Sequence, residues 1–407
     1  MIYWAPFLHF YQPPTQYHTV LDKICKESYR PLVKVFKDHT EAKLTINICG
    51  ALTQMLGMYG YGDIITNLRE LGLNGQLEFV ESSKFHAILP LIPQEEITRQ
   101  IKLNHKTNLY FFKDAYKPKG FFPPEMCYSD ESASLIGKMG YEWIISSGIS
   151  CQEAWPQDVI YQSKPIGNMK VFYRDDIISN RISFKNVDAK GFILNLMELG
   201  KSKKDIYVIT AMDAETFGHH IPRWEKLFLG EFFNIIGNKK AKYQIRSVTI
   251  SELLKKFPVS KGKPPIRSSW STTKEDIQKG NFYPLWKDPS NKIHSLQWEH
   301  LNIALLMLQE ANKRKDNEKS GGFFKMAREI MDEALHSCQF WWANKNRWNI
   351  NLINKGLILQ EESLLNAYNA INLSKCGENE KKIYYNEVIK ARDIAGKIRD
   401  EILGKTS

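Results

Sequence analysis

The feature that most constrains this chain is an alternation of short apolar runs with longer amphipathic stretches across roughly its first 260 residues. Seven of these runs have the length of strands: 2–9, 43–49, 76–81, 120–123, 142–147, 206–212 and 245–250. Strands that are apolar throughout are buried on both faces, which is typical of parallel sheets covered by helices. The alternation therefore predicts an α/β fold, and seven strands favour a distorted (β/α)7-type barrel.

Composition shifts along the chain predict three segments. Residues 1–260 are expected to form the barrel and catalytic domain, with a β-rich insertion near 159–184. A stretch rich in Pro, Gly and Ser opens a connecting region at 261–294, and helical periodicity predicts a C-terminal α-helical bundle over 295–407. Because no glycine-rich phosphate-binding motif follows any strand, a nucleotide-binding sheet is disfavoured.

Charge and cysteine content exclude several classes of partner. The net charge is +11, but basic residues are mixed with acids and form no block interleaved with aromatics, so we expect no nucleic-acid partner. The six cysteines lie far apart, which fits neither a disulfide framework nor a zinc ribbon and favours a reducing, cytoplasmic location. With neither a long apolar run nor a basic leader, no membrane association is expected, and the oligomeric state stays open.

Carboxylates and imidazoles gather where two predicted strands end. The strand at 206–212 continues into "MDAETFGHH", and the strand at 120–123 continues directly into Glu125. In a parallel barrel such strand ends meet at one face, so Glu125 and Asp213 are expected to face one pocket. Two carboxyl groups flanking a glycosidic bond are the minimum requirement for its hydrolysis.

Five stretches in this order, "HFYQPP", "GQLEFVE", "GFFPPE", "MDAETFGHH" and "LHSCQFWWAN", make the chain resemble glycoside hydrolase family 57. The resemblance implies a (β/α)7 barrel with a helical region and retaining chemistry on α-1,4-glucans without a metal or other cofactor. It assigns Glu125 as the nucleophile and Asp213 as the general acid/base, and a retaining pair of this kind is expected about 5–6 Å apart. Substrate contacts are expected from residues in and around these stretches: His9, Tyr11, Gln12, Glu78, His86, Glu215, His219, His220, Trp270, His336, Gln339 and Trp341.

Several alternatives remain open at this level. Glu215 either faces the pocket beside Asp213 or pairs with a cation such as Arg223. Trp342 is as well explained by packing as by sugar contact, and Trp270 is preferred over Trp286 for stacking. Tyr11 stands where the family usually has a second His, and Gln339 replaces an acid often seen in the fifth stretch.

Two other function classes also remain. One is a metal-dependent carbohydrate deacetylase, for which His9, Asp213, His219 and His220 are the candidate ligands. The other is a glycan-binding homologue without catalytic activity. Within the leading reading, α-amylase, 4-α-glucanotransferase and branching activity share one covalent step, and the motifs do not distinguish them.

Overall fold

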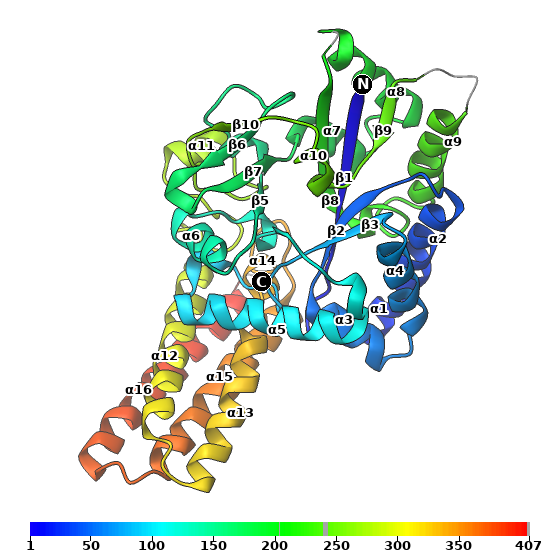
Figure 1. Ribbon diagram of the computed structural model, residues 1–407. Helices are drawn as coiled ribbons and strands as arrows, with labels where there is room; N and C mark the ends of the chain where they lie inside the picture. The colour runs from blue at the N-terminus through cyan, green and yellow to red at the C-terminus, as the bar shows by residue number, and fades with distance from the viewer. Residues whose placement is uncertain (203, 239–242, 405–407) are drawn as a thin grey trace. The chain divides into compact units, whose positions relative to one another are not determined.

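The computed structural model describes residues 1–202, 204–238 and 243–404. The chain forms two compact units, which are shown in Figure 1. The first comprises residues 1–12 and 16–274, and the second comprises residues 13–15 together with the chain from residue 275 onward.

The first unit contains two five-stranded sheets. Their strands are β1 (Ile2–Phe10), β2 (Leu44–Ile48), β3 (Leu77–Val80), β4 (Gly120–Phe121), β5 (Trp143–Ser146), β6 (Ile160–Ser163), β7 (Met169–Tyr173), β8 (Ile206–Asp213), β9 (Ile245–Ser247) and β10 (Val259–Lys261). One sheet has the order β3-β2-β1-β8, with β9 also pairing with β1, and the other has the order β10-β6-β7-β5-β4. Every pairing is parallel except that of β6 with β7.

Backbone hydrogen bonds join the two sheets at both sides. Next to β3, the Glu81 amide donates to the Gly120 carbonyl (2.9 Å), and the Phe122 amide donates to the Glu81 carbonyl (2.8 Å). Beyond β7, the Asp175 amide donates to the Ile209 carbonyl of β8 (2.8 Å). The strands β1, β2, β3, β4, β5, β7 and β8 therefore follow one another in a ring.

All seven predicted apolar runs contain strands, but the ring uses a different seventh member. The run at 245–250 gives the three-residue β9, which pairs only with the first residues of β1 before α10 (Ile250–Leu253) begins. The segment 159–184 supplies β6, β7 and the helix α7 (Asp176–Ser183). β7 pairs with β5, so it takes the ring position that the sequence pattern suggested for β9.

Helices follow most strands of the first unit. They are α1 (His18–Ile24), α2 (Arg30–Asp38), α3 (Gly50–Met58), α4 (Gly62–Leu73), α5 (Gln94–Phe112), α6 (Asp130–Lys138), α8 (Ala189–Leu199) and α9 (Glu231–Gly237), in addition to α7 and α10. Two segments are π-helical: η1 (Cys25–Tyr29) joins α1 to α2, and η9 (Glu225–Gly230) leads into α9. α2 packs against η9 and α4 (Figure 1).

Strand side chains alternate between two apolar clusters. Along β1, Ala5 and Phe7 belong to a cluster that also contains side chains of α10, whereas Trp4 and Leu8 pack with the surrounding helices. The cluster with α10 fills the inside of the ring. Because β8 alternates in the same way, His9 and Asp213 lie on the inner face at the carboxyl ends of their strands.

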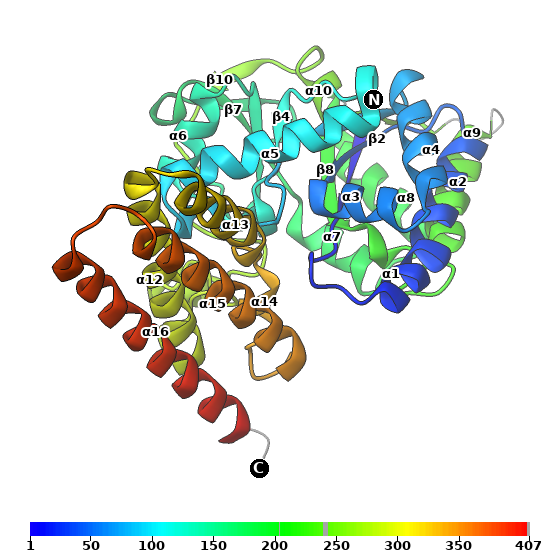
Figure 2. The same ribbon diagram turned by 90° about the horizontal axis from the view of Figure 1, so that it is seen from below.

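The second unit is helical. Its helices are α12 (Lys292–Arg314), α13 (Glu318–Ala334), α14 (Cys338–Trp341), α15 (Ile350–Asn372) and α16 (Glu378–Gly404), and α11 (Lys274–Gln278) precedes them. α12, α13 and α15 pack against one another, and α16 packs on α12 and α15 (Figure 2). Among the described residues, no helix combines the length and apolarity that crossing a membrane requires.

Candidate active site

One layer of polar side chains closes the inside of the ring at the carboxyl ends of the strands. His9 of β1 is in register with Asn47 of β2 on one side and with Asp213 of β8 on the other. The Nδ1 atom of His9 lies 2.7 Å from Oδ1 of Asn47, which fixes the ring orientation. Burial lowers the pKa of His9 to about 4, so this imidazole is neutral at pH 7.

Glu125 occupies a strained turn directly after β4. Its φ is 58° and that of Met126 is 50°, a left-handed conformation that residues other than glycine adopt at a cost. Trp270 holds this turn twice, because its amide donates to the Glu125 carbonyl (3.1 Å) and its indole Nε1–H donates to Oε2 (2.7 Å). A donor aimed at a carboxylate stabilises its charged form.

Flat rings surround Glu125. The Nδ1 atom of His86 lies 3.7 Å from Oε1 of Glu125, and the His86 ring stacks on Tyr11 at 3.9 Å and on His9 at 4.8 Å between centroids. The Trp270 ring meets His9 edge to face at 5.9 Å. The structure thus brings four predicted site residues, His9, Tyr11, His86 and Trp270, together around Glu125.

Asp213 is the last residue of β8, and its surroundings differ from those of Glu125. Burial raises the pKa of Asp213, and the nearby Arg174 guanidinium partly opposes that rise. Arg174 follows β7 and donates from Nε to the Ala211 carbonyl of β8 (2.7 Å), and its guanidinium lies 5.9 Å from the Trp270 ring. Arg174 therefore connects the strand that carries Asp213 with the indole that holds Glu125.

Glu215 is buried two residues after Asp213. The Tyr29 hydroxyl and the Gln12 amide, the latter at 2.7 Å, both donate to its Oε1, so its partners are these two side chains and not Arg223. Burial and the neighbouring Asp213 carboxylate raise the pKa of Glu215. Two carboxyl groups this close titrate as a pair.

The remaining histidines of this loop have other partners. Nδ1 of His219 lies 2.7 Å from a carboxylate oxygen of Glu27, and His220 is exposed with its ring 5.6 Å from that of His219. Gly218 has a φ of 113°, and a Cβ there would lie 1.9 Å from the Glu27 carbonyl oxygen, so the turn requires glycine. In the ranges that the structure describes, no three His, Cys, Asp or Glu side chains are grouped to hold a metal ion.

Glu78 lies one layer below His9 and Asp213 inside the ring. It is in register with Thr45, whose Oγ1 donates to its carboxylate (3.0 Å), and it accepts a second bond from the Ser251 amide of α10 (3.1 Å). Burial raises the pKa of Glu78. These hydrogen bonds direct Glu78 toward α10, where it links β2 and β3 to that helix inside the ring.

The predicted residues of the second unit lie close to one another on α14 and the turn before it. His336 and Gln339 are fully buried, and the Gln339 amide donates to the carbonyls of Ala334 and His336. Trp341 is partly exposed and its ring meets that of Trp342 at 4.6 Å. Trp286 is fully buried, which agrees with the preference for Trp270 as a stacking surface.

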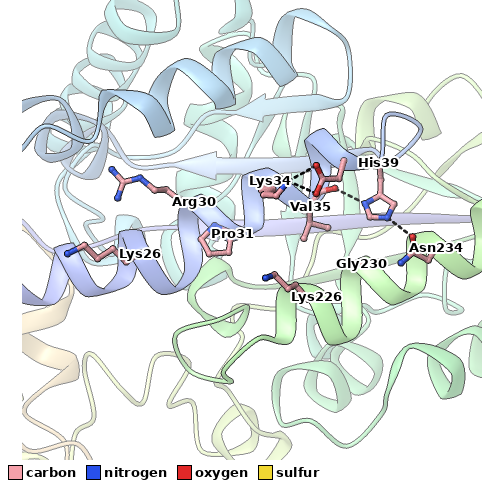
Figure 3. A pocket seen from close by; sticks show the side chains of 10 residues that line it. Lys26, Arg30, Pro31, Lys34, Val35, His39, Lys226, Gly230 and Asn234 are labelled. Carbon is pink, nitrogen blue, oxygen red and sulfur yellow. Dashed lines mark hydrogen bonds and ion pairs between the residues drawn. The ribbon is translucent and has the colours of Figure 1, made fainter.

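A separate cavity of about 450 Å³ opens on the outer surface of the first unit, between α2 and η9 (Figure 3). Its lining includes Lys26, Arg30, Lys34 and Lys226. Lys26 pairs with the carboxylate of Asp22, Arg30 with that of Asp63 and Lys34 with that of Asp38. The cavity is therefore a largely neutralised, solvated surface and shares no lining residue with the carboxylate site.

Comparison with known proteins identifies the family. Residues 6–262 match the family described as glycosyl hydrolase family 57. The chain belongs to this family. This match confirms the family resemblance, and it contains the first four of the five motif stretches.

Named relatives of family 57 span several activities. The chain is 27% identical to an α-amylase of Pyrococcus abyssi and 28% identical to a 4-α-glucanotransferase of Thermococcus litoralis, each over 263 residues, which is 61% of this chain and 38% of the relative. It therefore spans about two fifths of the length of these relatives. A branching enzyme structure from Thermococcus kodakaraensis is similar with a TM-score of 0.71 at 15% identity, covering 96% of this chain and 95% of that one. This likeness confirms the expected α/β fold with a C-terminal helical region.

Three residues of this site were not anticipated from the sequence. Arg174 opens the sequence "RDD" after β7, but the predicted insertion at 159–184 hid that strand end. Asn47 is a strongly polar residue between the apolar Ile46 and Ile48 of its run, which is a usable signal for an inward-facing group. Tyr29 is an isolated tyrosine in an amphipathic stretch, and the sequence contains no sign of its contact with Glu215.

Proposed function

We propose that this protein cleaves or transfers α-1,4-glucans by a retaining mechanism through a covalent glycosyl-enzyme intermediate. The observation that carries the proposal is the contrast between two carboxyl groups at the carboxyl ends of two strands of one ring, β4 and β8. Glu125 is partly exposed and receives an indole N–H, which favours a charged nucleophile. Asp213 is likewise partly exposed, but desolvation raises its pKa, which favours a proton donor.

In the first step Glu125 attacks the anomeric carbon while Asp213 protonates the leaving glycosidic oxygen. In the second step Asp213 takes a proton from water or from a sugar hydroxyl, which then displaces Glu125. The stacked rings of Tyr11, His86 and His9 offer a flat surface beside the reacting centre. The contributions of His336, Gln339 and Trp341 to glucan binding stay predictions.

Variants of the two carboxyl groups test the assignment. Asp213→Asn should still form the intermediate from α-glucosyl fluoride, because fluoride leaves without a proton, and azide, which needs no base, should release it as a glucosyl azide of retained α configuration. Glu125→Gln should lose turnover on both substrates, since no covalent intermediate forms. Azide added to Glu125→Gln should instead give a β azide. Activity of Glu125→Gln on the fluoride without azide, with Asp213→Asn inactive, would mean that the roles are reversed.

Product analysis separates the activities within the family. The wild-type protein is incubated with maltoheptaose and with amylose, and the products are resolved by chromatography. Shorter chains alone indicate hydrolysis, shorter and longer chains together indicate transfer, and new α-1,6 linkages indicate branching. Absence of any product, unchanged by Glu125→Gln, would support the non-catalytic glycan-binding alternative.

A further inference from the structure

The π-helical segment η1 contacts the loop after β8 through three consecutive residues. The Glu27 carboxylate bonds His219, the Ser28 hydroxyl donates to the Ala214 carbonyl (2.9 Å), and the Tyr29 hydroxyl donates to Glu215. In a regular α-helix successive side chains point about 100° apart, so three in a row rarely reach one loop. The wider π-turn here lies against the site loop, and such turns occur often at functional sites.

A chain of hydrogen bonds with a fixed direction also ends on Glu215. The Tyr17 backbone amide donates to Oε1 of Gln16 (2.9 Å), Nε2 of Gln16 donates to Oε1 of Gln12 (2.7 Å), and Nε2 of Gln12 donates to Oε1 of Glu215 (2.7 Å). A backbone N–H can only donate, so it sets the orientation of both glutamine amides. Oε1 of Glu215 is therefore an acceptor for Gln12 as well as for Tyr29.

Two donors on one oxygen favour the charged form of Glu215. Among the described residues, its neighbour Asp213 has no comparable pair of hydrogen-bond donors. The cation near Asp213 is Arg174, and the hydrogen bonds of Arg174 go to Ala211, Asp176 and Asn180 instead. A buried carboxyl pair of this kind holds one proton more readily than it holds none. Burial and the charge of Asp213 raise the pKa of Glu215, whereas the hydrogen bonds from Tyr29 and Gln12 lower it, so these two bonds oppose placing the proton on Glu215.

We propose that Tyr29 and Gln12 are positioning residues that hold Glu215 as the charged member of the pair and thereby keep the proton on Asp213. The proposal rests on the role assigned above to Asp213 as general acid. Tyr29 and Gln12 act through Glu215 and take no part in bond making. The other titratable groups near the pair are Cys25 of η1, His9 of β1, Arg174 after β7, and Glu225 of η9, which lies against Gly218.

Site-specific titration tests the proposal directly. In protein labelled with ¹³C-carboxyl aspartate, the Asp213 resonance is assigned by its absence from Asp213→Asn. Tyr29→Phe removes one donor from Glu215, so the proton moves to Glu215, and Asp213 titrates about one pH unit lower. Gln12→Met removes the second donor by an independent change and should move Asp213 in the same direction. Unchanged Asp213 titration in both variants would overturn the proposal.

Tyr116→Phe is the matched control. Tyr116 is also buried, and its hydroxyl also donates to a buried carboxylate, Oε1 of Glu81 at 2.9 Å, which lies next to β3. Its loss removes the same kind of hydrogen bond without touching Glu215. The Asp213 titration should stay at the wild-type pH in this variant, and an equal shift there would mean that any loosening of the fold moves it.

Kinetics separate this proposal from the proposed function. Above the new Asp213 midpoint, kcat/KM on maltoheptaose should fall about tenfold in Tyr29→Phe, whereas kcat/KM on α-glucosyl fluoride should stay near wild type, because only the glucan needs the proton in the first step. Equal losses on both substrates would contradict the positioning role. Wild-type protein that acts on neither substrate would instead refute the proposed function, while the titration still tests the placement of the proton.

Discussion

The first unit contains two buried clusters built around a glutamate, and they use the carboxylate in opposite ways. Glu81 follows β3 and has donors on both oxygens: Asn104 and Tyr116 bond Oε1, and His105 and Tyr141 bond Oε2. For Glu215, the hydrogen bonds found within the described residues both end on Oε1, and an acid lies two residues away. Burial alone therefore does not mark a catalytic carboxylate. Incomplete pairing beside a second acid leaves a proton that can be exchanged, and saturated pairing gives a structural brace.

The largest expected difference between the clusters is in turnover. Asp213→Asn should lower kcat on α-1,4-glucan by about 10²- to 10⁴-fold, because it removes the proton donor. Glu81→Gln should leave kcat within a few-fold of wild type. The measurement is initial rate on maltoheptaose, with folding checked by circular dichroism. If a folded Glu81→Gln protein were as slow as Asp213→Asn, the Glu81 cluster could not be called purely structural.

For the free energy of unfolding, the change at Glu81 should have the larger effect and the change at Glu215 the smaller one. Glu81→Leu leaves the buried polar partners of Glu81 without their acceptor, and we expect the free energy of unfolding to fall by about 3 kcal/mol. Glu215→Gln keeps an acceptor for Tyr29 and Gln12 and removes a charge that burial disfavours, so its loss should stay below about 1 kcal/mol. Urea unfolding followed by fluorescence measures both. Similar losses in the two variants would show that Glu215 is also a brace.

Trp270→Phe sharpens the contrast between the two proposed catalytic carboxyl groups. The variant keeps a flat ring and the backbone bond to Glu125 but removes the indole N–H. Because the proposed nucleophile, Glu125, is needed for every substrate, kcat/KM should fall about tenfold on glucan and on α-glucosyl fluoride alike. The comparison with Tyr29→Phe is informative, since that change should affect only the glucan.

The smallest effect concerns His105. Its hydrogen bond to Glu81 raises the pKa of His105 above the value in the unfolded chain, and partial burial opposes this. The stabilising effect is therefore complete below about pH 6.5 and is lost as the pH rises through the higher folded pKa. The free energy of unfolding should fall as the pH rises above about 6.5, by less than about 1 kcal/mol because the ring is half exposed. His105→Gln should flatten this dependence.

The sequence predicted the positions of the strands better than it predicted their pairing and the long-range side-chain contacts. Apolar runs located every strand of the ring except β7, whose alternation with polar residues resembles an excursion although it pairs with β5. The motif residues His9, Glu125 and Asp213 were predicted as site residues because strand ends in a parallel ring converge, and each lies at or just after such an end. Glu78 was expected beside the sugar, but strand register sets it one layer deeper. Long-range contacts such as that of Tyr29 with Glu215 depend on packing between segments that no local pattern connects.

The left-handed turn at Glu125 and Met126 has a consequence for the order in which the chain is made. Trp270, which secures that turn through two hydrogen bonds, lies 145 positions later, beyond the end of the family match at residue 262. During synthesis, both candidate catalytic carboxylates are therefore added to the chain well before Trp270, whose indole orients that of Glu125. A chain cut at residue 262 retains both acids yet lacks the indole, and its strained turn is free to relax toward ordinary backbone angles.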